Sequence, residues 1–333
     1  MTKTFNHFGA TTEAKEVTSA FSDQIKGRTF VITGVSQGSI GLTTAKNIII
    51  HQPKELVILG RDSGRLEVAK EILENLCDDK KCIEAIKVDL ASMSSVRLAA
   101  KEFEKRNINI DVLINNAAIM ALPKRQFSDI GIELQFTTNH LGPFLLTELL
   151  LERFNENARI VNVTSNGHVY CPIRFTDINF EKPKSTLPEE ERLGIDFHSL
   201  LNEFDGNYNG WQAYGQSKTA NILYSSFINK NLSEKGLRSY AVHPGSIATN
   251  LTQHQDENKL NQVREAYGTI RKTLEQGAST TLVAALDPSL QSDSIPENVY
   301  MADCQLSEKV SAYAIENDKA SRLYQLSKSL TAL

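Results

Sequence analysis

The sequence predicts an α/β fold, a Rossmann-type doubly wound parallel sheet with helices on both faces, formed by a single domain. Two patterns support this prediction. Short runs rich in β-branched residues alternate with longer helical stretches, an order typical of right-handed β-α-β crossovers. The short runs also lack alternating polar residues, which indicates strands covered on both faces. A chain of 333 residues is long enough to bury such a sheet.

Each predicted element has its own local signal. Residues 1–26 are expected to form a polar lead-in and a short helix, because Ala14, Val17, Phe21 and Ile25 recur three or four positions apart. The main domain is expected over residues 27–333. Its apolar runs predict strands at 29–33, 55–59, 83–88, 110–114, 159–163 and 237–242, with a last run near 298–301. Its helical periodicity predicts helices at 41–50, 62–76, 92–106, 129–154 and 213–235.

Two segments depart from this alternation of strands and helices. Residues 171–212 contain three prolines and the charged run Glu189–Arg192, which predicts a long surface insertion within the domain and not a domain boundary. Residues 246–275 contain the polar run Gln253–Asn258. We expect this second segment to be a mobile loop over a substrate site.

Composition excludes several classes of partner. The chain has 23% charged and 41% hydrophobic residues and a net charge of -4, so neither nucleic acid nor an anionic membrane is an expected partner. No apolar stretch is long enough for a transmembrane helix. Glu13 and Glu16 argue against a transit peptide, which leaves the cytoplasm as the expected location. The four cysteines lack metal-ligand spacing, so free thiols and no metal site are expected.

A glycine-rich turn predicts a nucleotide site. Thr33–Gly41 directly follows the first strand and opens the first helix. Glycines permit a tight turn and let backbone N–H groups approach a pyrophosphate, whose charge the helix N-terminus favours. Gly34 and Gly41 lie seven residues apart, one more than in either common dinucleotide pattern, so either Gly38 or Ser39 must accommodate an extra residue. The residues expected to bind cofactor here are Gly34, Ser36, Gly38, Ser39, Ile40 and Gly41.

The residues after the second strand indicate which cofactor binds. An acidic residue about 20 positions past the turn binds the ribose of NAD, whereas an arginine there accommodates the 2′-phosphate of NADP. Arg61 lies 20 residues after Gly41. We therefore expect NADP(H), and Asp62 next to Arg61 keeps NAD(H) as the less favoured alternative.

Two tyrosines stand four residues before a lysine, and one of the two pairs is predicted to be catalytic. Tyr214 and Lys218 follow the glycine turn and precede another strand, whereas Tyr324 and Lys328 lie in the last helix near the C-terminus. We interpret the second pair as helix-surface neighbours. Residues i and i+4 share a helix face, so the Lys218 ammonium is expected to lower the pKa of the Tyr214 phenol toward neutrality. The tyrosine would then serve as a general acid and base.

Two further polar residues are catalytic candidates. Ser165 stands at the carboxyl end of a predicted strand, the edge where open α/β sheets bind ligands. Its hydroxyl could hold a substrate oxygen against Tyr214. Asn139 falls within an apolar helical stretch, where a buried amide must find hydrogen-bond partners. A water- or lysine-linked role is therefore expected for Asn139.

Taken together in this order, these motifs resemble the short-chain dehydrogenase/reductase family. The resemblance covers about residues 28–251, and the runs Asn139–Gly142 and Tyr214–Lys218 are similar to the branch of retinol dehydrogenases and the WW-domain oxidoreductase. It implies a catalytic tetrad of Asn139, Ser165, Tyr214 and Lys218, with Tyr214 and Lys218 also touching the cofactor. It adds to the cofactor site Asp89, Leu90, Asn116, Ala117, Pro244, Gly245, Ile247 and Thr249.

The chain departs from the family pattern at three places. The glycine turn has its extra residue, and Asn115–Ala118 ends in alanine where glycine is commoner. Ser165 and Tyr214 stand 49 residues apart, which is more than the family usually has. The excess is the 171–212 insertion, which is expected to shape the substrate pocket.

The leading hypothesis is an NADP(H)-dependent oxidoreductase that interconverts a bulky apolar alcohol and its ketone or aldehyde. Two alternatives stay open: a low-turnover cofactor-binding scaffold or sensor, and a sugar-nucleotide epimerase or dehydratase. Relatives are often dimers or tetramers through their long helices, so a homodimer or homotetramer through 92–106 and 129–154 is an expectation.

Overall fold

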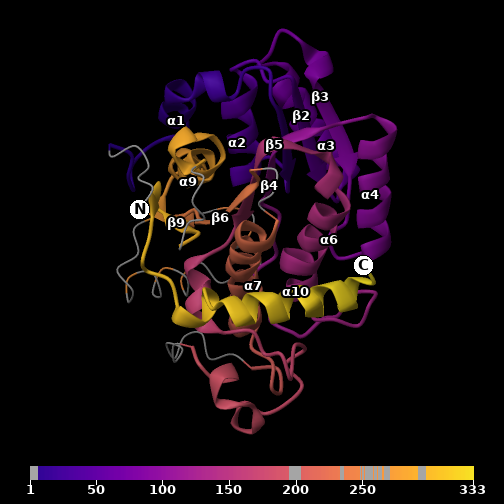
Figure 1. Cartoon of the computed structure of the whole chain (residues 1–333), viewed down its shortest axis with the longest axis vertical. Coiled ribbons are helices and arrows are strands. Elements are labelled where there is room, and N and C mark those ends of the chain that lie inside the picture. Colours follow the sequence, from indigo (N-terminus) through magenta and orange to yellow (C-terminus); the bar gives the residue numbers. More distant parts are fainter. Residues whose placement is uncertain are drawn as a thin grey trace.

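The central feature of the computed structural model is an eight-stranded, mostly parallel sheet (Figure 1). The structure describes residues 7–194, 204–232, 236–247, 271–291 and 298–333, together with residues 249, 251, 258, 261 and 265. The strand order is β10-β9-β6-β5-β4-β1-β2-β3, and only β10 runs antiparallel to its neighbour. The chain winds outward from β1 to β3 and then returns to β4 beside β1. This order confirms the predicted doubly wound Rossmann-type sheet.

The strands are β1 (Thr29–Thr33), β2 (Glu55–Gly60), β3 (Ile83–Lys87), β4 (Ile110–Asn115), β5 (Phe154–Val163), β6 (Arg238–His243), β9 (Tyr300–Ala302) and β10 (Gln305–Leu306), with a separate pair of β7 (Ser246–Ile247) and β8 (Arg271–Lys272). β1 is buried at all five positions. Burial on both faces agrees with its uninterrupted apolar sequence.

Helices cover both faces of the sheet. The helices are α1 (Ala14–Ala20), α2 (Ile40–Ile49), α3 (Ser63–Glu74), α4 (Met93–Lys105), α5 (Leu134–Phe136), α6 (Gly142–Leu149), α7 (Gly210–Asn231), α9 (Leu274–Leu286) and α10 (Asn317–Thr331). The apolar residues of α1, α2, α3 and α9 form one core cluster, and those of α4, α6, α7 and α10 form the other. The first cluster includes the four residues of the predicted N-terminal stripe.

The expected helix over 129–154 is wrong at both ends. Residues 129–133 form a turn, the helix begins at Leu134, and β5 already starts at Phe154. Between α5 and α6 lies a π-helical segment, Thr137–Leu141. Pro143 has no N–H to donate to the carbonyl of Asn139 four residues earlier. The Gly142 N–H donates instead to the carbonyl of Thr137, five residues back.

The described part of the insertion before α7, residues 171–194 and 204–209, forms the lobe at the foot of the molecule, below α7 (Figure 1). Its described residues include short 3-10 turns at Lys184–Thr186 and Glu189–Glu191. Arg174 fastens the lobe to α7: its N–H donates to Gln216 Oε1 at 2.9 Å and its guanidinium to Gln212 Oε1 at 2.6 Å. The expected 246–275 loop lies largely outside the described residues.

The C-terminal helix α10 crosses the face formed by α4, α6 and α7 (Figure 1). Three contacts hold it there. His140 Nε2 lies 2.8 Å from Ser327 Oγ, the Tyr324 hydroxyl donates to Glu148 Oε2 at 2.9 Å, and the Arg97 guanidinium donates to the Thr331 carbonyl at 2.7 Å. The helices expected to form a subunit interface, 92–106 and 129–154, are therefore partly covered by α10 of the same chain.

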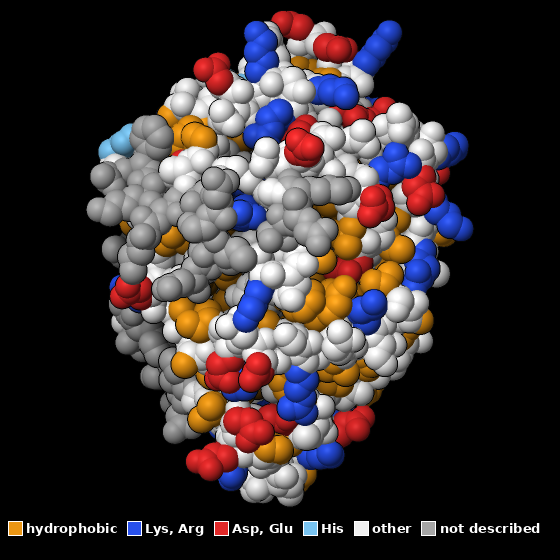
Figure 2. All heavy atoms as spheres, in the orientation of Figure 1, with side chains coloured by type: hydrophobic (Ala, Val, Ile, Leu, Met, Phe, Trp, Pro, Cys, Tyr) orange, Lys and Arg blue, Asp and Glu red, His pale blue; other side chains and the backbone are white. Residues whose placement is uncertain are grey.

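The viewed face of the molecule carries charged side chains of both signs (Figure 2). Figure 2 shows acidic and basic side chains interspersed on the viewed face, with apolar side chains gathered between α6 and α10. Within the described part of the chain, no helix is both long and apolar enough to cross a membrane.

Close packing at Gly142 leads to a stability prediction. A Cβ on Gly142 would overlap the Leu90 carbonyl, so α6 could not approach the loop after β3. We expect Gly142→Ala to lower the free energy of unfolding by about 1–3 kcal/mol, the usual cost of overpacking, measured by urea denaturation. Gly9→Ala is the control, since a Cβ there meets nothing within 4 Å; equal stability of the two variants would contradict the prediction.

Candidate active site

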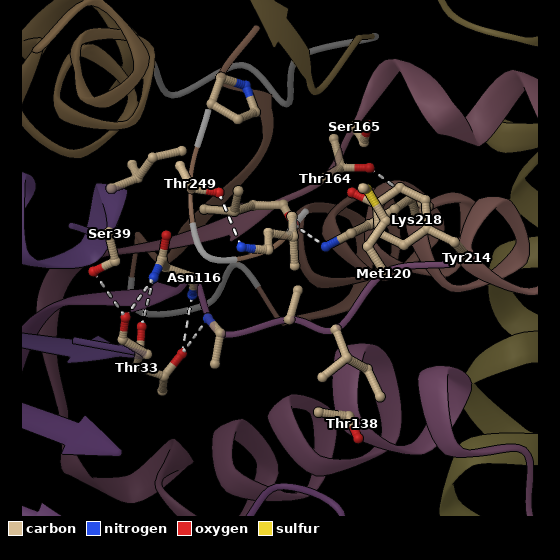
Figure 3. A pocket seen from close by; sticks show the side chains of 18 of the residues that line it. Thr33, Ser39, Asn116, Met120, Thr138, Thr164, Ser165, Tyr214, Lys218 and Thr249 are labelled. Carbon is tan, nitrogen blue, oxygen red and sulfur yellow. Dashed lines mark hydrogen bonds between the residues drawn. The ribbon is translucent and has the colours of Figure 1, made fainter. Parts of the chain in front are cut away.

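A cavity of about 490 Å³ opens at the carboxyl ends of the parallel strands (Figure 3). It extends from the turn after β1 to Ser165 after β5, where α7 contributes Tyr214 and Lys218. The cavity is lined by nearly all the residues expected from sequence: Gly34, Ser36, Ser39, Ile40, Arg61, Asp89, Leu90, Asn116, Ala117, Ser165, Tyr214, Lys218, Pro244, Gly245, Ile247 and Thr249. Gly38, Gly41 and Asn139 do not line it.

The glycine turn accommodates its extra residue through Gly38. Residues 36–39 form a tight turn in which the Ser39 N–H donates to the Ser36 carbonyl at 3.1 Å. Gly38 takes a φ of 75°, a backbone conformation that favours glycine. Ser39 then caps α2, because its hydroxyl accepts the N–H of Leu42 at 3.1 Å. The first-turn N–H groups of Ile40 and Gly41 have no acceptor within the helix, which suits an anion at this end of the cavity.

The glycine turn and the end of β4 are in close contact. Asn116 Nδ2 donates to the carbonyls of Thr33 at 2.8 Å and Gly34 at 3.2 Å, and Thr33 Oγ1 accepts the N–H of Asn116 and of Ala117 at 3.0 Å each (Figure 3). A Cβ on Gly34 would lie 2.7 Å from Ala117 Cα. Asn116 thus fixes the shape of the turn, and glycine at position 34 is required by this contact.

Two arginines line the cavity where β2 ends. Arg61 and Arg65 both contribute to the wall, and both are exposed. Asp62 serves a different purpose, because its carboxylate caps α3 by accepting the Arg65 N–H at 2.9 Å. Asp89, across from them after β3, accepts the Ala91 N–H at 3.0 Å. This end of the cavity is therefore lined by two basic side chains and one acidic side chain.

Ser165 and Tyr214 meet at the other end of the cavity. The Tyr214 phenol and the Ser165 hydroxyl both line this end of the cavity, and the Ser165 side chain acts to lower the pKa of Tyr214. Ser165 Oγ also accepts the Gly167 N–H at 3.0 Å, which holds the turn after β5. Tyr214 is 5% exposed. A bound carbonyl oxygen could therefore reach both hydroxyls beside a phenol that is largely shielded from solvent.

Lys218 lies one helical turn after Tyr214 on the same face of α7. Its Nζ is 5.5 Å from the centroid of the Tyr214 ring and donates to the Val163 carbonyl at 2.9 Å. The Thr164 hydroxyl donates to the Lys218 carbonyl at 2.7 Å, which fixes α7 to the end of β5. In Figure 3 the Tyr214, Lys218 and Ser165 side chains gather at one place.

The expected lowering of the Tyr214 pKa does not occur in the free site. Burial raises the pKa of Tyr214 to about 12, opposed by the hydrogen bond from Ser165. Burial also lowers the pKa of Lys218 to about 7. Desolvation disfavours the charged form of each group, and the Lys218 ammonium donates to a backbone carbonyl and not to the phenol.

The side-chain amide of Asn139 finds its hydrogen-bond partners within the protein. Its Oδ1 accepts the Ile119 N–H, and its Nδ2 donates to the Ile119 carbonyl and to Ser217 Oγ, each at 2.9 Å. Ile119 lines the cavity, and Ser217 lies on α7 between Tyr214 and Lys218. The Asn139 side chain thus joins the cavity wall to the helix that carries the tyrosine and lysine.

The wall after β6 is built on Pro244 and Gly245. Gly245 has a φ of 96°, and a Cβ there would lie 2.6 Å from Lys272 Cδ. Ile247 belongs to the short strand β7, and the Thr249 hydroxyl accepts the Leu251 N–H at 3.2 Å. These residues close the cavity near Lys218.

Sequence reasoning missed several residues of the cavity wall: Arg65, Met120, Thr138, Tyr170, Trp211 and His243. Arg65 follows Arg61 by four positions, a helical spacing that could have indicated it. Tyr170 directly precedes the insertion and Trp211 lies near its end on α7, with ring centroids 6.4 Å apart. The rest of the described insertion does not line the cavity. Among the described residues, no group of three or more His, Cys, Asp or Glu residues could hold a metal ion.

Comparison with known proteins agrees with this geometry. Residues 28–175 match the family model for short chain dehydrogenase. The chain is 37% identical to Oxidoreductase fscI of Fusarium equiseti, over 72% of this chain and 94% of the relative. It is 34% identical to human Retinol dehydrogenase 11, over 93% of this chain and 87% of the relative. A crystal structure of a protein from Mycobacterium paratuberculosis superposes with a TM-score of 0.66 and 29% identity, over 92% of this chain and 94% of that one. The chain therefore belongs to the short-chain dehydrogenase/reductase family of oxidoreductases, in its retinol dehydrogenase-like branch.

Proposed function

We propose that this protein is an NADP(H)-dependent oxidoreductase that interconverts an apolar alcohol and its ketone or aldehyde, with Tyr214 as acid and base. The observation that carries the proposal is the meeting of Ser165, Tyr214 and Lys218 in the cavity whose other end is the glycine turn. A hydride donor bound along this cavity would lie between an anion-binding turn and a proton donor.

In the reduction of a carbonyl, the residues of this site would have the following roles. When bound, the reduced nicotinamide supplies a hydride to the substrate carbonyl carbon. Tyr214 donates its phenolic proton to the carbonyl oxygen as negative charge develops there. Ser165 Oγ donates a second hydrogen bond to the same oxygen. Lys218 supplies positive charge beside the phenol and a donor for the ribose hydroxyls.

The protonation state of Tyr214 is compatible with carbonyl reduction. A tyrosine with a pKa of about 12 is protonated at neutral pH. A neutral phenol is the form that can give a proton to a carbonyl oxygen. Alcohol oxidation would first require removal of that proton.

The preference for NADP(H) over NAD(H) rests on three residues. Arg61 and Arg65 can both reach a 2′-phosphate, and a guanidinium is well suited to phosphate. The Asp62 carboxylate, which would favour the ribose of NAD, is engaged at the start of α3.

The substrate is proposed to be bulky and apolar. Beside Ser165 and Tyr214 the cavity wall is formed by Met120, Tyr170 and Trp211. Apolar and aromatic walls with a few convergent polar groups are typical of sites for such molecules. We also propose the cytoplasm as its location, on the overall composition given above.

A low-turnover cofactor-binding scaffold is the second candidate. The observation that favours it is the raised pKa of Tyr214, because a weak acid is a slow proton donor. Turnover by a tyrosine variant separates the two candidates.

Tyr214→Phe tests the enzyme proposal. We expect kcat to fall by roughly 10²–10⁴-fold, the usual contribution of a positioned proton donor, while NADPH still binds. The assay follows loss of NADPH absorbance with a panel of apolar ketones and aldehydes. Tyr324→Phe is the matched control, since Lys328 Nζ lies 5.8 Å from the Tyr324 ring. Unchanged turnover in Tyr214→Phe would favour the scaffold.

Removal of the arginines tests the choice of cofactor. Arg61→Ala and Arg65→Ala should each raise the Kd of NADPH about tenfold or more, because each removes a charge-assisted hydrogen bond, and should leave NADH binding unchanged. Fluorescence titration measures both affinities. Arg153→Ala controls for loss of positive charge, because Arg153 directly precedes the amino end of β5, whereas the cavity lies at the carboxyl ends of the strands. Equal wild-type affinity for NADH and NADPH would contradict the assignment.

The pKa of Lys218 predicts that cofactor binding takes up a proton. Burial lowers this pKa from 10.5 to about 7 in the free protein, and an anionic ligand favours the ammonium. NADPH affinity should therefore fall as pH rises above 7, by up to about tenfold per pH unit. Calorimetry in buffers of different ionisation enthalpy measures the proton uptake. The uptake should vanish in Lys218→Met; uptake that persists there would assign it to another group.

A further inference from the structure

His168 is a buried histidine that lies outside the cavity but contacts the turn that carries Ser165. It is fully buried, three residues after Ser165, in the 3-10 helix Asn166–Tyr170. Its Nδ1 lies 2.8 Å from the Ser165 carbonyl oxygen. Its Nε2 accepts the backbone N–H of Ser311 at 3.2 Å.

These two contacts fix the tautomer of His168. A backbone N–H can only donate, so Nε2 must be the nitrogen without a proton. In a neutral imidazole the proton is then on Nδ1, where it can be donated to the Ser165 carbonyl. Burial lowers the pKa of His168, which favours this neutral form.

A second histidine holds the other side of the same peptide group. The Asn166 N–H donates to His243 Nδ1 at 3.1 Å. The Ser165 carbonyl and the Asn166 N–H belong to one planar peptide unit and point in opposite directions. His243 must therefore be the Nε2–H tautomer, the opposite of His168, and burial lowers its pKa to about 4.

We propose that His168 and His243 are positioning residues that hold the Ser165–Asn166 peptide plane from both sides and thereby aim the Ser165 hydroxyl at Tyr214. This inference rests on the proposed function. The peptide plane sets the backbone direction at Ser165, and small displacements of a catalytic group are costly in rate. Neither histidine needs to touch the substrate oxygen for this role.

His168 is itself held by distant parts of the chain. Its carbonyl accepts the Tyr313 hydroxyl at 2.9 Å and the Thr219 hydroxyl at 3.1 Å. The Tyr300 ring packs against its imidazole with centroids 5.0 Å apart. Thr219 lies on α7 next to Lys218, and Ser311 and Tyr313 lie just before α10. The C-terminal segment is therefore joined through His168 to the serine turn.

The contacts of His168 and His243 with the Ser165–Asn166 peptide are called the clamp. The first part of the test measures the clamp without any catalytic assay. Amide exchange by NMR should find the Asn166 N–H protected in the wild type. Exchange should accelerate at least about tenfold in His243→Leu, which removes the acceptor. It should also accelerate in His168→Leu, although His168 does not touch that N–H. His140→Asn is the control for loss of a buried histidine, because His140 bonds Ser327 on α10.

The second part measures catalysis in the carbonyl–NADPH assay. His168→Leu should lower kcat by about 10- to 100-fold and leave the Kd of NADPH unchanged. His168→Asn keeps an N–H near the Nδ1 position and should recover most of kcat, whereas His168→Gln, whose amide reaches the Nε2 position, should not. The effects of His168→Leu and His243→Leu on kcat should not add, because both act on one peptide.

The outcomes separate the two proposals. A protected Asn166 N–H that responds to both leucine variants supports the clamp even if no carbonyl is turned over, and only the enzymatic function then fails. An unprotected Asn166 N–H in the wild type, or one indifferent to His168→Leu, overturns the clamp. Full kcat in His168→Leu overturns its positioning role.

Discussion

Burial of Lys218 without a carboxylate partner is the constraint on which the site depends. Its ammonium is 2% exposed and donates to the Val163 carbonyl, and in the described part of the chain no acidic side chain pairs with it. Lowering a lysine pKa from 10.5 to about 7 corresponds to a cost of about 5 kcal/mol for the charged form. Because its pKa is near neutrality, Lys218 can take up a proton next to Tyr214 when an anionic ligand binds or a phenolate develops there.

The arrangement of the sheet brings this charge into one cavity with the nucleotide-binding turn. The strand order reverses between β1 and β4, and the loops diverging from such a point leave a crevice at the carboxyl ends of the strands. Contacts between Thr33 and Asn116 set one end of the crevice. Contacts among Ser165, Tyr214 and Lys218 set the other. Of the described residues of the insertion only Trp211, on α7, lines the cavity, together with Tyr170 directly before the insertion. The long insertion therefore leaves this framework intact.

Local patterns predicted what depends on neighbouring residues. Runs of β-branched residues located β1 and β2. The motifs before and after Tyr214 distinguished it from Tyr324, whose hydroxyl donates to Glu148. The helix predicted over 129–154 was too long at both ends, because Glu133 pairs with Phe127 in an isolated antiparallel bridge and β5 already begins at Phe154. Sequence spacing placed Lys218 beside Tyr214 but did not reveal how deeply the two side chains are buried. The predicted direction of the Tyr214 pKa shift was therefore wrong. The roles of His168 and His243 depend on contacts across 143 and 77 positions, which one sequence does not reveal.

The central claim is that desolvation, and not an ion pair, sets the proton equilibrium beside Tyr214. The most direct test is an NMR titration of the Lys218 side chain in the ligand-free protein, with its signal assigned by Lys218→Arg. We expect a pKa of about 7. A pKa near 10.5, the ordinary value for lysine, would show a hydrated ammonium and contradict the account.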